Sequence, residues 1–134
     1  MKKLLLLSIL FISLSPMAQN EKAETPKIAV KKEIGQTISL QGVSLTFIDV
    51  IEDSRCPKYT NCIWAGRAVV LVEVKVNGKK EQKKIYLGET RNNEPTSKIL
   101  YSKDGYFIEV VALNPYPEDG KEKAPYTLLV CESK

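Results

Sequence analysis

Apolar residues recur at every second position along most of the chain from residue 28 onward, which is the period of a β-strand with one buried face. The alternation is clearest over residues 68–76. Asn77 and Gly78 follow at once, and this dipeptide is typical of a two-residue hairpin turn, because both residues tolerate the positive φ angles of a type I′ turn. The same pattern predicts further strands over residues 37–40, 43–50, 99–101, 106–113 and 126–131. Residues 79–87 are expected to be the return strand of the hairpin, with a wholly polar first half that projects into solvent.

The strand predicted over residues 43–50 changes its apolar face partway. Val43, Leu45 and Phe47 share one face, whereas Ile48 and Val50 lie on the other. Such a change predicts either a β-bulge near Phe47 or a strand that is buried on both faces.

No segment after residue 28 has a helical period, so the predicted fold class is all-β. About six short strands in a chain of this length favour a small antiparallel OB-like barrel of five to six strands. A small immunoglobulin-like β-sandwich is the alternative. Residues 28–134 are expected to form this single β-barrel domain.

The first 27 residues have a different composition. Lys2 and Lys3 precede an apolar stretch over residues 4–14, and small residues follow it, which predicts a secretory signal peptide over residues 1–19. The stretch is shorter than the ~20 residues needed to span a bilayer, so no transmembrane anchor is expected. Residues 20–27 are polar and proline-bearing, which predicts a flexible lead-in. No cysteine lies near the cleavage point, so we expect a periplasmic or secreted protein that is not a lipoprotein.

Composition narrows the functional classes. The 134 residues include no histidine and three cysteines. A Ser-His-Asp triad, a Cys-His pair and a four-thiolate metal site are therefore all excluded, and we expect neither an enzyme, a metal nor a cofactor. The net charge is +4, from 20 basic and 16 acidic residues, and it falls to +2 when the two lysines of the leader are removed. This small excess gives no reason to expect a nucleic-acid partner, and a monomer is expected.

Residues 53–66 are unlike the rest, because they contain two of the three cysteines and the single tryptophan. In an exported protein we expect Cys56 and Cys62 to form a disulfide, which would contribute about 2 kcal/mol by constraining a seven-residue ring. Trp64 and Gly66 are expected to be structural, with Trp64 closing one end of the barrel. Cys131 is expected to be a small apolar residue of the last strand, although a bridge from it to Cys56 or Cys62 stays open.

A clamped, exposed loop is also a candidate binding element, because rigidity lowers the entropic cost of association. Arg55 or Lys58 would suit the specificity pocket of a trypsin-like protease, and an oxygen of the same loop would approach the metal of a metalloprotease. The candidate binding residues are Ser54, Arg55, Pro57, Lys58, Tyr59, Thr60 and Asn61.

The chain resembles a group of small bacterial exported proteins through the motif DSRCPxxxxCxWAG at residues 53–66 and the run LNPYP at residues 113–117. Its size and all-β pattern are similar to those of the potempins, bacterial inhibitors with an OB-like barrel that block secreted metallo- and serine proteases. The potempins in turn resemble the tissue inhibitors of metalloproteinases in architecture. The resemblance implies a protease inhibitor whose partner is a secreted protease. Potempins are lipoproteins, whereas this chain lacks the lipidated cysteine.

The alternative function is an envelope-associated structural module that binds a protein or glycan without inhibiting anything. In that case we expect the lysine-rich residues 79–84 or the polar residues 89–97 to carry the interaction, and not the clamped loop.

Overall fold

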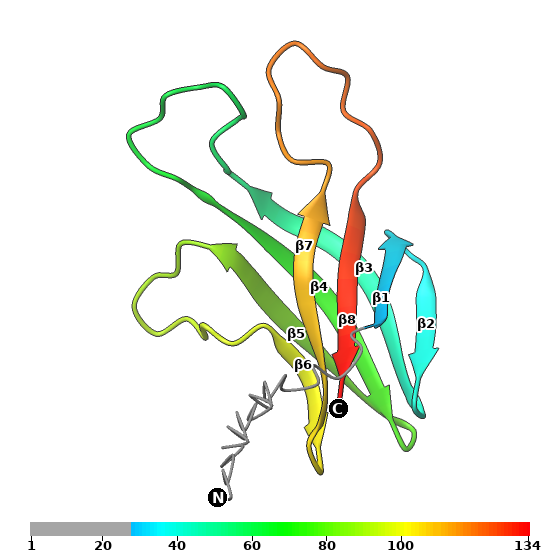
Figure 1. Ribbon diagram of the computed structural model, residues 1–134. Helices are drawn as coiled ribbons and strands as arrows, with labels where there is room; N and C mark the ends of the chain where they lie inside the picture. Colours follow the sequence, from blue (N-terminus) through cyan, green and yellow to red (C-terminus); the bar gives the residue numbers. More distant parts are fainter. Residues whose placement is uncertain (1–27) are drawn as a thin grey trace, which may run out of the picture.

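The computed structural model describes residues 28–134 (Figure 1); the predicted signal peptide and the lead-in lie outside the described residues. Two four-stranded antiparallel sheets have the strand orders β1-β8-β7-β6 and β2-β3-β4-β5. The strands are β1 (Ile28–Glu33), β2 (Thr37–Leu40), β3 (Val43–Asp53), β4 (Arg67–Val76), β5 (Lys79–Gly88), β6 (Ile99–Lys103), β7 (Tyr106–Asn114) and β8 (Thr127–Ser133). The predicted all-β class is confirmed.

The two antiparallel sheets are consistent with the small β-barrel, or the alternative small β-sandwich, that the sequence predicts, although the number of strands within residues 28–134 exceeds the expected five to six. Eight strands are present, and every ladder within residues 28–134 except β1–β8 joins strands that are consecutive in the chain. This order is a meander, whereas an OB barrel is a Greek key. The extra strand β1 is largely exposed at a sheet edge, so its sequence lacks the alternation that predicts a half-buried strand.

The core lies between the two sheets and takes one face of each central strand. Ala68, Val70, Val72 and Val74 of β4 face it, as the alternation predicts. The bulge predicted near Phe47 is present, since the β3–β4 register shifts between Phe47 and Asp49, and a second shift lies between Val50 and Glu52.

These two bulges decide which way the end of β3 faces. Asp53 pairs with the core-facing Ala68, whereas Glu52 pairs with Val69 on the outer face. Directly opposed residues of an antiparallel pair share a face. The carboxylates of Glu52 and Asp53 therefore point to opposite sides of the same sheet.

The two ends of the molecule are built differently (Figure 1). Three two-residue turns lie at one end, and each has two positive φ angles: 49° and 80° at Gln41 and Gly42, 49° and 79° at Asn77 and Gly78, and 50° and 81° at Asp104 and Gly105. The predicted turn at Asn77 and Gly78 is thus confirmed. The long loops 54–66 and 115–126 lie together at the opposite end. No helix within residues 28–134 has the length and apolarity to cross a membrane.

Candidate functional site

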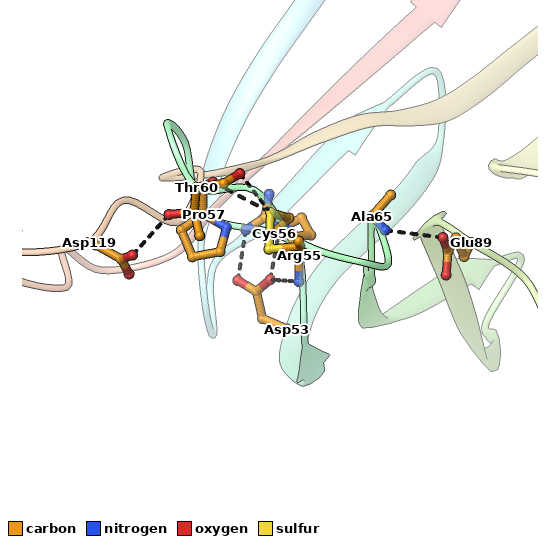
Figure 2. Close-up of a disulfide and its surroundings, with 9 residues drawn as sticks. Asp53, Arg55, Cys56, Pro57, Thr60, Ala65, Glu89 and Asp119 are labelled. Atoms are coloured by element: carbon orange, nitrogen blue, oxygen red, sulfur yellow. Dashed lines mark hydrogen bonds and ion pairs between the residues drawn. A yellow bond between two sulfur atoms is a disulfide. The ribbon is translucent and has the colours of Figure 1, made fainter.

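The β3–β4 loop, residues 54–66, is closed by the predicted Cys56–Cys62 disulfide, with the two Cα atoms 6.0 Å apart (Figure 2). Below the ring, the N–H of Cys56 donates to the carbonyl of Ala65 at 2.9 Å. The N–H of Ser54 donates to the carbonyl of Arg67 at 2.8 Å. The two limbs of the loop are therefore hydrogen-bonded to one another at the base. Cys131 is buried and free, as predicted.

Gly66 allows the two limbs to approach this closely. Its φ is +73°, and a Cβ atom built on it would lie 1.9 Å from the carbonyl oxygen of Ser54. Any larger residue would collide with backbone in addition to adopting an unfavourable left-handed conformation. Gly66 is therefore a structural requirement of the loop.

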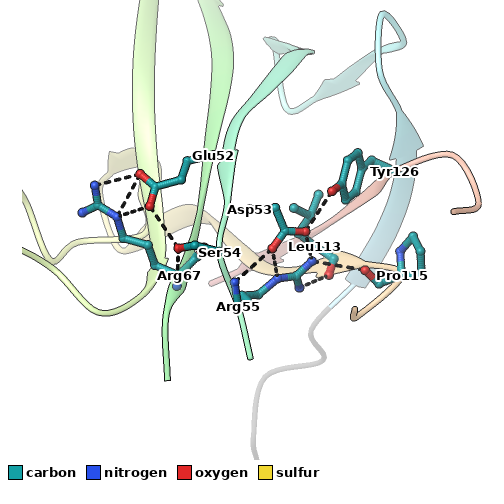
Figure 3. Close-up of polar contacts among 8 residues, drawn as sticks. All are labelled: Glu52, Asp53, Ser54, Arg55, Arg67, Leu113, Pro115 and Tyr126. Atoms are coloured by element: carbon teal, nitrogen blue, oxygen red, sulfur yellow. Dashed lines mark hydrogen bonds and ion pairs between the residues drawn. The ribbon is translucent and has the colours of Figure 1, made fainter. Parts of the chain in front are cut away.

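The side chain of Arg55 is buried, and this corrects its expected role as an exposed binding residue. It is only 8% exposed, and its Nε and Nη2 each donate to Asp53 at 2.7 Å (Figure 3). The guanidinium also donates to the carbonyls of Leu113 at 2.8 Å and Pro115 at 3.1 Å, and it lies 4.9 Å from the ring centre of Tyr116. Arg55 therefore joins the end of β3 to the end of β7 and is not available to a specificity pocket.

Asp53 is the acceptor at the centre of this network. It also accepts a hydrogen bond from the hydroxyl of Tyr126 at 2.9 Å. Burial opposes the charge of Asp53, but the hydrogen bonds from Arg55 and Tyr126 outweigh it and hold the pKa of its carboxyl below the usual value. Burial and the contact with Asp53 raise the pKa of Tyr126. The network thus favours the ionised carboxylate and the neutral phenol.

A second ion-pair network covers the outer face at the same end. Arg67 donates to Glu52 at 2.9 Å and pairs with Glu94 of the β5–β6 loop. The hydroxyl of Ser54, a candidate binding residue that is exposed, also donates to Glu52 at 3.0 Å. Hydrogen bonds from Arg67 and Ser54 lower the pKa of Glu52. This network holds Glu94 of the β5–β6 loop against Arg67, the first residue of β4.

The β3–β4 loop is also attached to the β7–β8 loop. The N–H of Lys58 donates to the carbonyl of Pro117 at 2.9 Å, and Lys58 forms a parallel bridge with Glu118. The hydroxyl of Thr60 donates to Asp119 at 3.0 Å (Figure 2). A cavity of about 630 Å³ lies between the two loops, with Pro57 and Tyr116 among its lining residues.

The tip of the loop is exposed. Lys58, Tyr59, Thr60 and Asn61 are all exposed, and Pro57 is half-buried. Tyr59 is 97% exposed and has a φ of +62°, and the N–H of Thr60 donates to the carbonyl of Pro57 at 3.3 Å. These features describe a tight β-turn centred on Lys58 and Tyr59. The structure brings the candidate binding residues into one loop but presents only four of the seven at its exposed tip.

Trp64 does not close the barrel, contrary to the expectation from sequence. Its side chain is 73% exposed, and that of its neighbour Ile63 is 92% exposed. Neither residue was expected to contact a partner. The sequence does carry a signal for this exposure. Ile63 and Trp64 are adjacent apolar residues, and in an extended backbone only one of two neighbouring side chains can face the core.

A second cavity, of about 540 Å³, lies at the foot of Ile63 and Trp64. The β5–β6 loop contributes Glu89, Thr90 and Arg91 to its lining. The N–H of Ala65 donates to the carboxylate of Glu89 at 3.2 Å, which ties this loop to the clamped one (Figure 2). Within residues 28–134, no three His, Cys, Asp or Glu side chains are grouped so that they could hold a metal ion.

No family model, curated protein or solved structure matches this chain, so its functional interpretation rests on its own residues.

Proposed function

We propose that the protein is an exported, non-enzymatic binding protein that inhibits a secreted metallo- or serine protease with its β3–β4 loop. The observation that carries this proposal is the contrast between the tip and the base of the loop. Residues 58–61 are exposed, while the backbone below them is held by the Cys56–Cys62 disulfide and the buried Arg55. A loop that is already ordered loses little conformational entropy on binding.

The shape of the tip favours one mode of inhibition. A substrate-like inhibitor places an extended segment along the protease cleft, with one side chain in the specificity pocket. Here Lys58 lies in a tight turn, and its N–H is committed to Pro117. This geometry supports a rigid tip that obstructs the cleft and does not support substrate-like insertion of Lys58. In a metalloprotease, an exposed oxygen such as the amide oxygen of Asn61 would approach the metal.

Two features support export. The disulfide is compatible with an oxidising compartment, where such bonds persist. The first 19 residues have the sequence order of a signal peptide. The lack of histidine, which removes the commonest general base, supports a binding protein over a hydrolase.

The test is inhibition of a panel of secreted metallo- and serine proteases by the oxidised protein. We expect inhibition of at least one protease, and we expect the double variant Lys58→Ala/Tyr59→Ala to lose it. The double variant Lys79→Ala/Lys103→Ala, at the hairpin end, is the matched control and should inhibit like the wild type. If no protease is inhibited at micromolar concentration with the disulfide intact, the proposal is wrong.

The alternative, a binding module without inhibitory activity, is favoured by the cavity that Glu89, Thr90 and Arg91 of the β5–β6 loop help to line. A partner recovered from the native culture medium would distinguish the two functions. Under the alternative, the partner would still bind the Lys58→Ala/Tyr59→Ala variant and would not be a protease.

A further inference from the structure

Exposed apolar side chains are unevenly distributed over residues 28–134. Tyr59, Ile63 and Trp64 are 97%, 92% and 73% exposed, whereas the other large exposed apolar side chains lie between 41% and 54%. All three belong to the β3–β4 loop. Clustered exposure of this degree on a soluble domain marks an interaction site, while single half-exposed residues need no explanation.

The exposure of Ile63 and Trp64, here called the Trp64 ridge, is imposed by the backbone. On one side of the ridge, Cys62 is bonded to Cys56. On the other side, Ala65 is hydrogen-bonded to both Cys56 and Glu89, and Gly66 is packed against the backbone of Ser54. Because the backbone is fixed on both sides, the side chains of Ile63 and Trp64 cannot rotate into the core. The surface of the ridge is therefore preorganised for a partner.

The cavity beside the ridge indicates the chemistry of that partner. Its lining residues include Glu89, Thr90 and Arg91 of the β5–β6 loop, together with the ion-paired Glu52 and Arg67. The guanidinium of Arg91 donates no hydrogen bond within residues 28–134, although its main-chain N–H donates to Glu94 and its charge adds to the hydrogen bonds that lower the pKa of Glu52 and Glu94. A bilayer could cover the apolar ridge and pair Arg91 with its phosphates, but it offers no positioned donor for the carboxylate of Glu89, which accepts one hydrogen bond within the described part of the chain, from Ala65. A protein can supply an apolar recess and, next to it, polar groups for the rim.

We propose that the Trp64 ridge is the anchor of the interface with the protease, and that the protease presents an apolar recess flanked by an acidic group that pairs with Arg91. This inference rests on the proposed function and adds a binding element to it. The turn at Lys58 and Tyr59 obstructs the cleft, while the ridge supplies most of the affinity from a neighbouring recess. Tryptophan is among the residues most enriched at the energetic centres of interfaces.

The single tryptophan gives a direct probe. Incorporation of 5-fluorotryptophan places one ¹⁹F label in the protein, at Trp64, and the label is visible beside any unlabelled protease. The labelled protein is mixed with each protease of the panel, and the inhibition constant is measured for three variants. These are Ile63→Ser/Trp64→Ser, Arg91→Ala, and the control Ile34→Ser/Val111→Ser, whose side chains are 44% and 42% exposed elsewhere on the surface.

We expect the ¹⁹F resonance to shift with the inhibited protease. Ile63→Ser/Trp64→Ser should raise the inhibition constant at least ~100-fold, because it removes the anchor. Arg91→Ala should raise it about tenfold, and the control less than about threefold. Thermal unfolding of each variant near the wild-type temperature excludes misfolding as the cause.

Failure of the inference and failure of the proposed function give different results. If a protease is inhibited equally by the wild type and by Ile63→Ser/Trp64→Ser, the anchor is wrong and the function stands. If a protease shifts the resonance without being inhibited, the ridge binds but the proposed function is wrong. If no protease does either, both are wrong; a shift only with vesicles of phosphatidylcholine and phosphatidylglycerol would then assign the ridge to a lipid surface.

Discussion

The hairpin end and the loop end of the molecule are held by different kinds of interaction. At the hairpin end, each turn is specified by two adjacent residues with positive φ, and the glycines at positions 42, 78 and 105 have open space around them. At the loop end, the chain is fixed by contacts between distant residues. Arg55 reaches carbonyls 58 and 60 residues away, and Tyr126 reaches Asp53 across 73 residues.

This difference between the two ends shows that a long loop needs tertiary contacts to be rigid, whereas a short turn does not. A two-residue turn has few conformations to choose from, so local backbone chemistry is sufficient. A loop of 13 residues has many conformations, and each must be excluded by a contact that the rest of the fold supplies. The buried Arg55, the disulfide and Gly66 together provide those contacts while leaving the tip exposed.

The largest expected effect comes from breaking the Arg55–Asp53 pair. Both side chains are at most 10% exposed. Replacing one partner of a buried pair leaves the other charge unpaired, so Arg55→Met should lower the free energy of unfolding by about 3–5 kcal/mol. Chemical denaturation at pH 7 measures this change.

The matched control is an exposed ion pair of the opposite end. Lys80 and Glu73 lie 3.2 Å apart, with side chains that are 60% and 21% exposed. Exposed pairs contribute little, so Lys80→Met should change the free energy of unfolding by less than about 1 kcal/mol. If Arg55→Met and Lys80→Met lower the free energy of unfolding equally, ion pairs stabilise the two ends to the same degree.

The next effect compares two glycines of similar conformation. Gly66 and Gly78 have φ angles of +73° and +79°, but only at Gly66 would a Cβ atom meet backbone within 4 Å. Gly78→Ala should cost about 1–2 kcal/mol, the penalty of a left-handed conformation alone. Gly66→Ala must also displace Ser54 and should cost at least about 3 kcal/mol. Thermal unfolding of both variants checks this order; a similar loss in each would show that close packing at Gly66 is unimportant.

The disulfide should have a moderate effect on stability and a large one on binding. Replacing both cysteines by serine removes a constraint worth about 2 kcal/mol in the unfolded chain. Arg55 and Gly66 still hold the base, so the fold should persist while the tip becomes mobile. We expect cooperative unfolding at a lower temperature, together with at least a tenfold weaker inhibition or partner binding. Unchanged binding by the serine variant would show that the ring does not preorganise the tip.

These contrasts also explain which features could be predicted from sequence. The strands β4 and β5 and their turn follow from alternation and from the dipeptide Asn77 and Gly78, which are local signals. The bulge near Phe47 is one of the two possibilities predicted, and the Cys56–Cys62 pairing is the one expected for two cysteines of one short segment in an exported protein. Each of these depends on residues that are close in sequence.

The roles of Arg55 and Trp64 could not be predicted in the same way. A charged residue in a loop is usually exposed, and only the folded ends of β3 and β7 bring Arg55 to the carbonyl of Leu113. A lone tryptophan is usually well buried, and only the constraints on both sides of Trp64 keep it at the surface. Both misassignments concern the loop end, where tertiary contacts outweigh local preference.

The smallest effect, a graded response to pH, should also separate the two ends. The pKa of Asp53 is lowered in the folded protein, so its ionisation stabilises the fold above the ordinary value of about 3.9. That contribution is lost as the pH falls through the lower folded value. The pKa of Tyr126 is raised, so its contribution is present below about 10 and is lost as the pH rises through the higher folded value.

Protonation of Asp53 at low pH and deprotonation of Tyr126 at high pH should therefore destabilise the loop end before the hairpin end. Asp53 and Tyr126 tie β3 to β8 at the loop end, while the turn at Asn77 and Gly78 is set by backbone conformation. Backbone amide NMR shifts, recorded from pH 7 down to pH 2 and up to pH 11, should change first at Cys56 and Lys58. The Asp53→Asn variant, which cannot ionise at this position, should show a weaker acid response at these amides. Simultaneous changes at Gly78 and Cys56 would mean that the two ends unfold as one unit and that Asp53 has no local role.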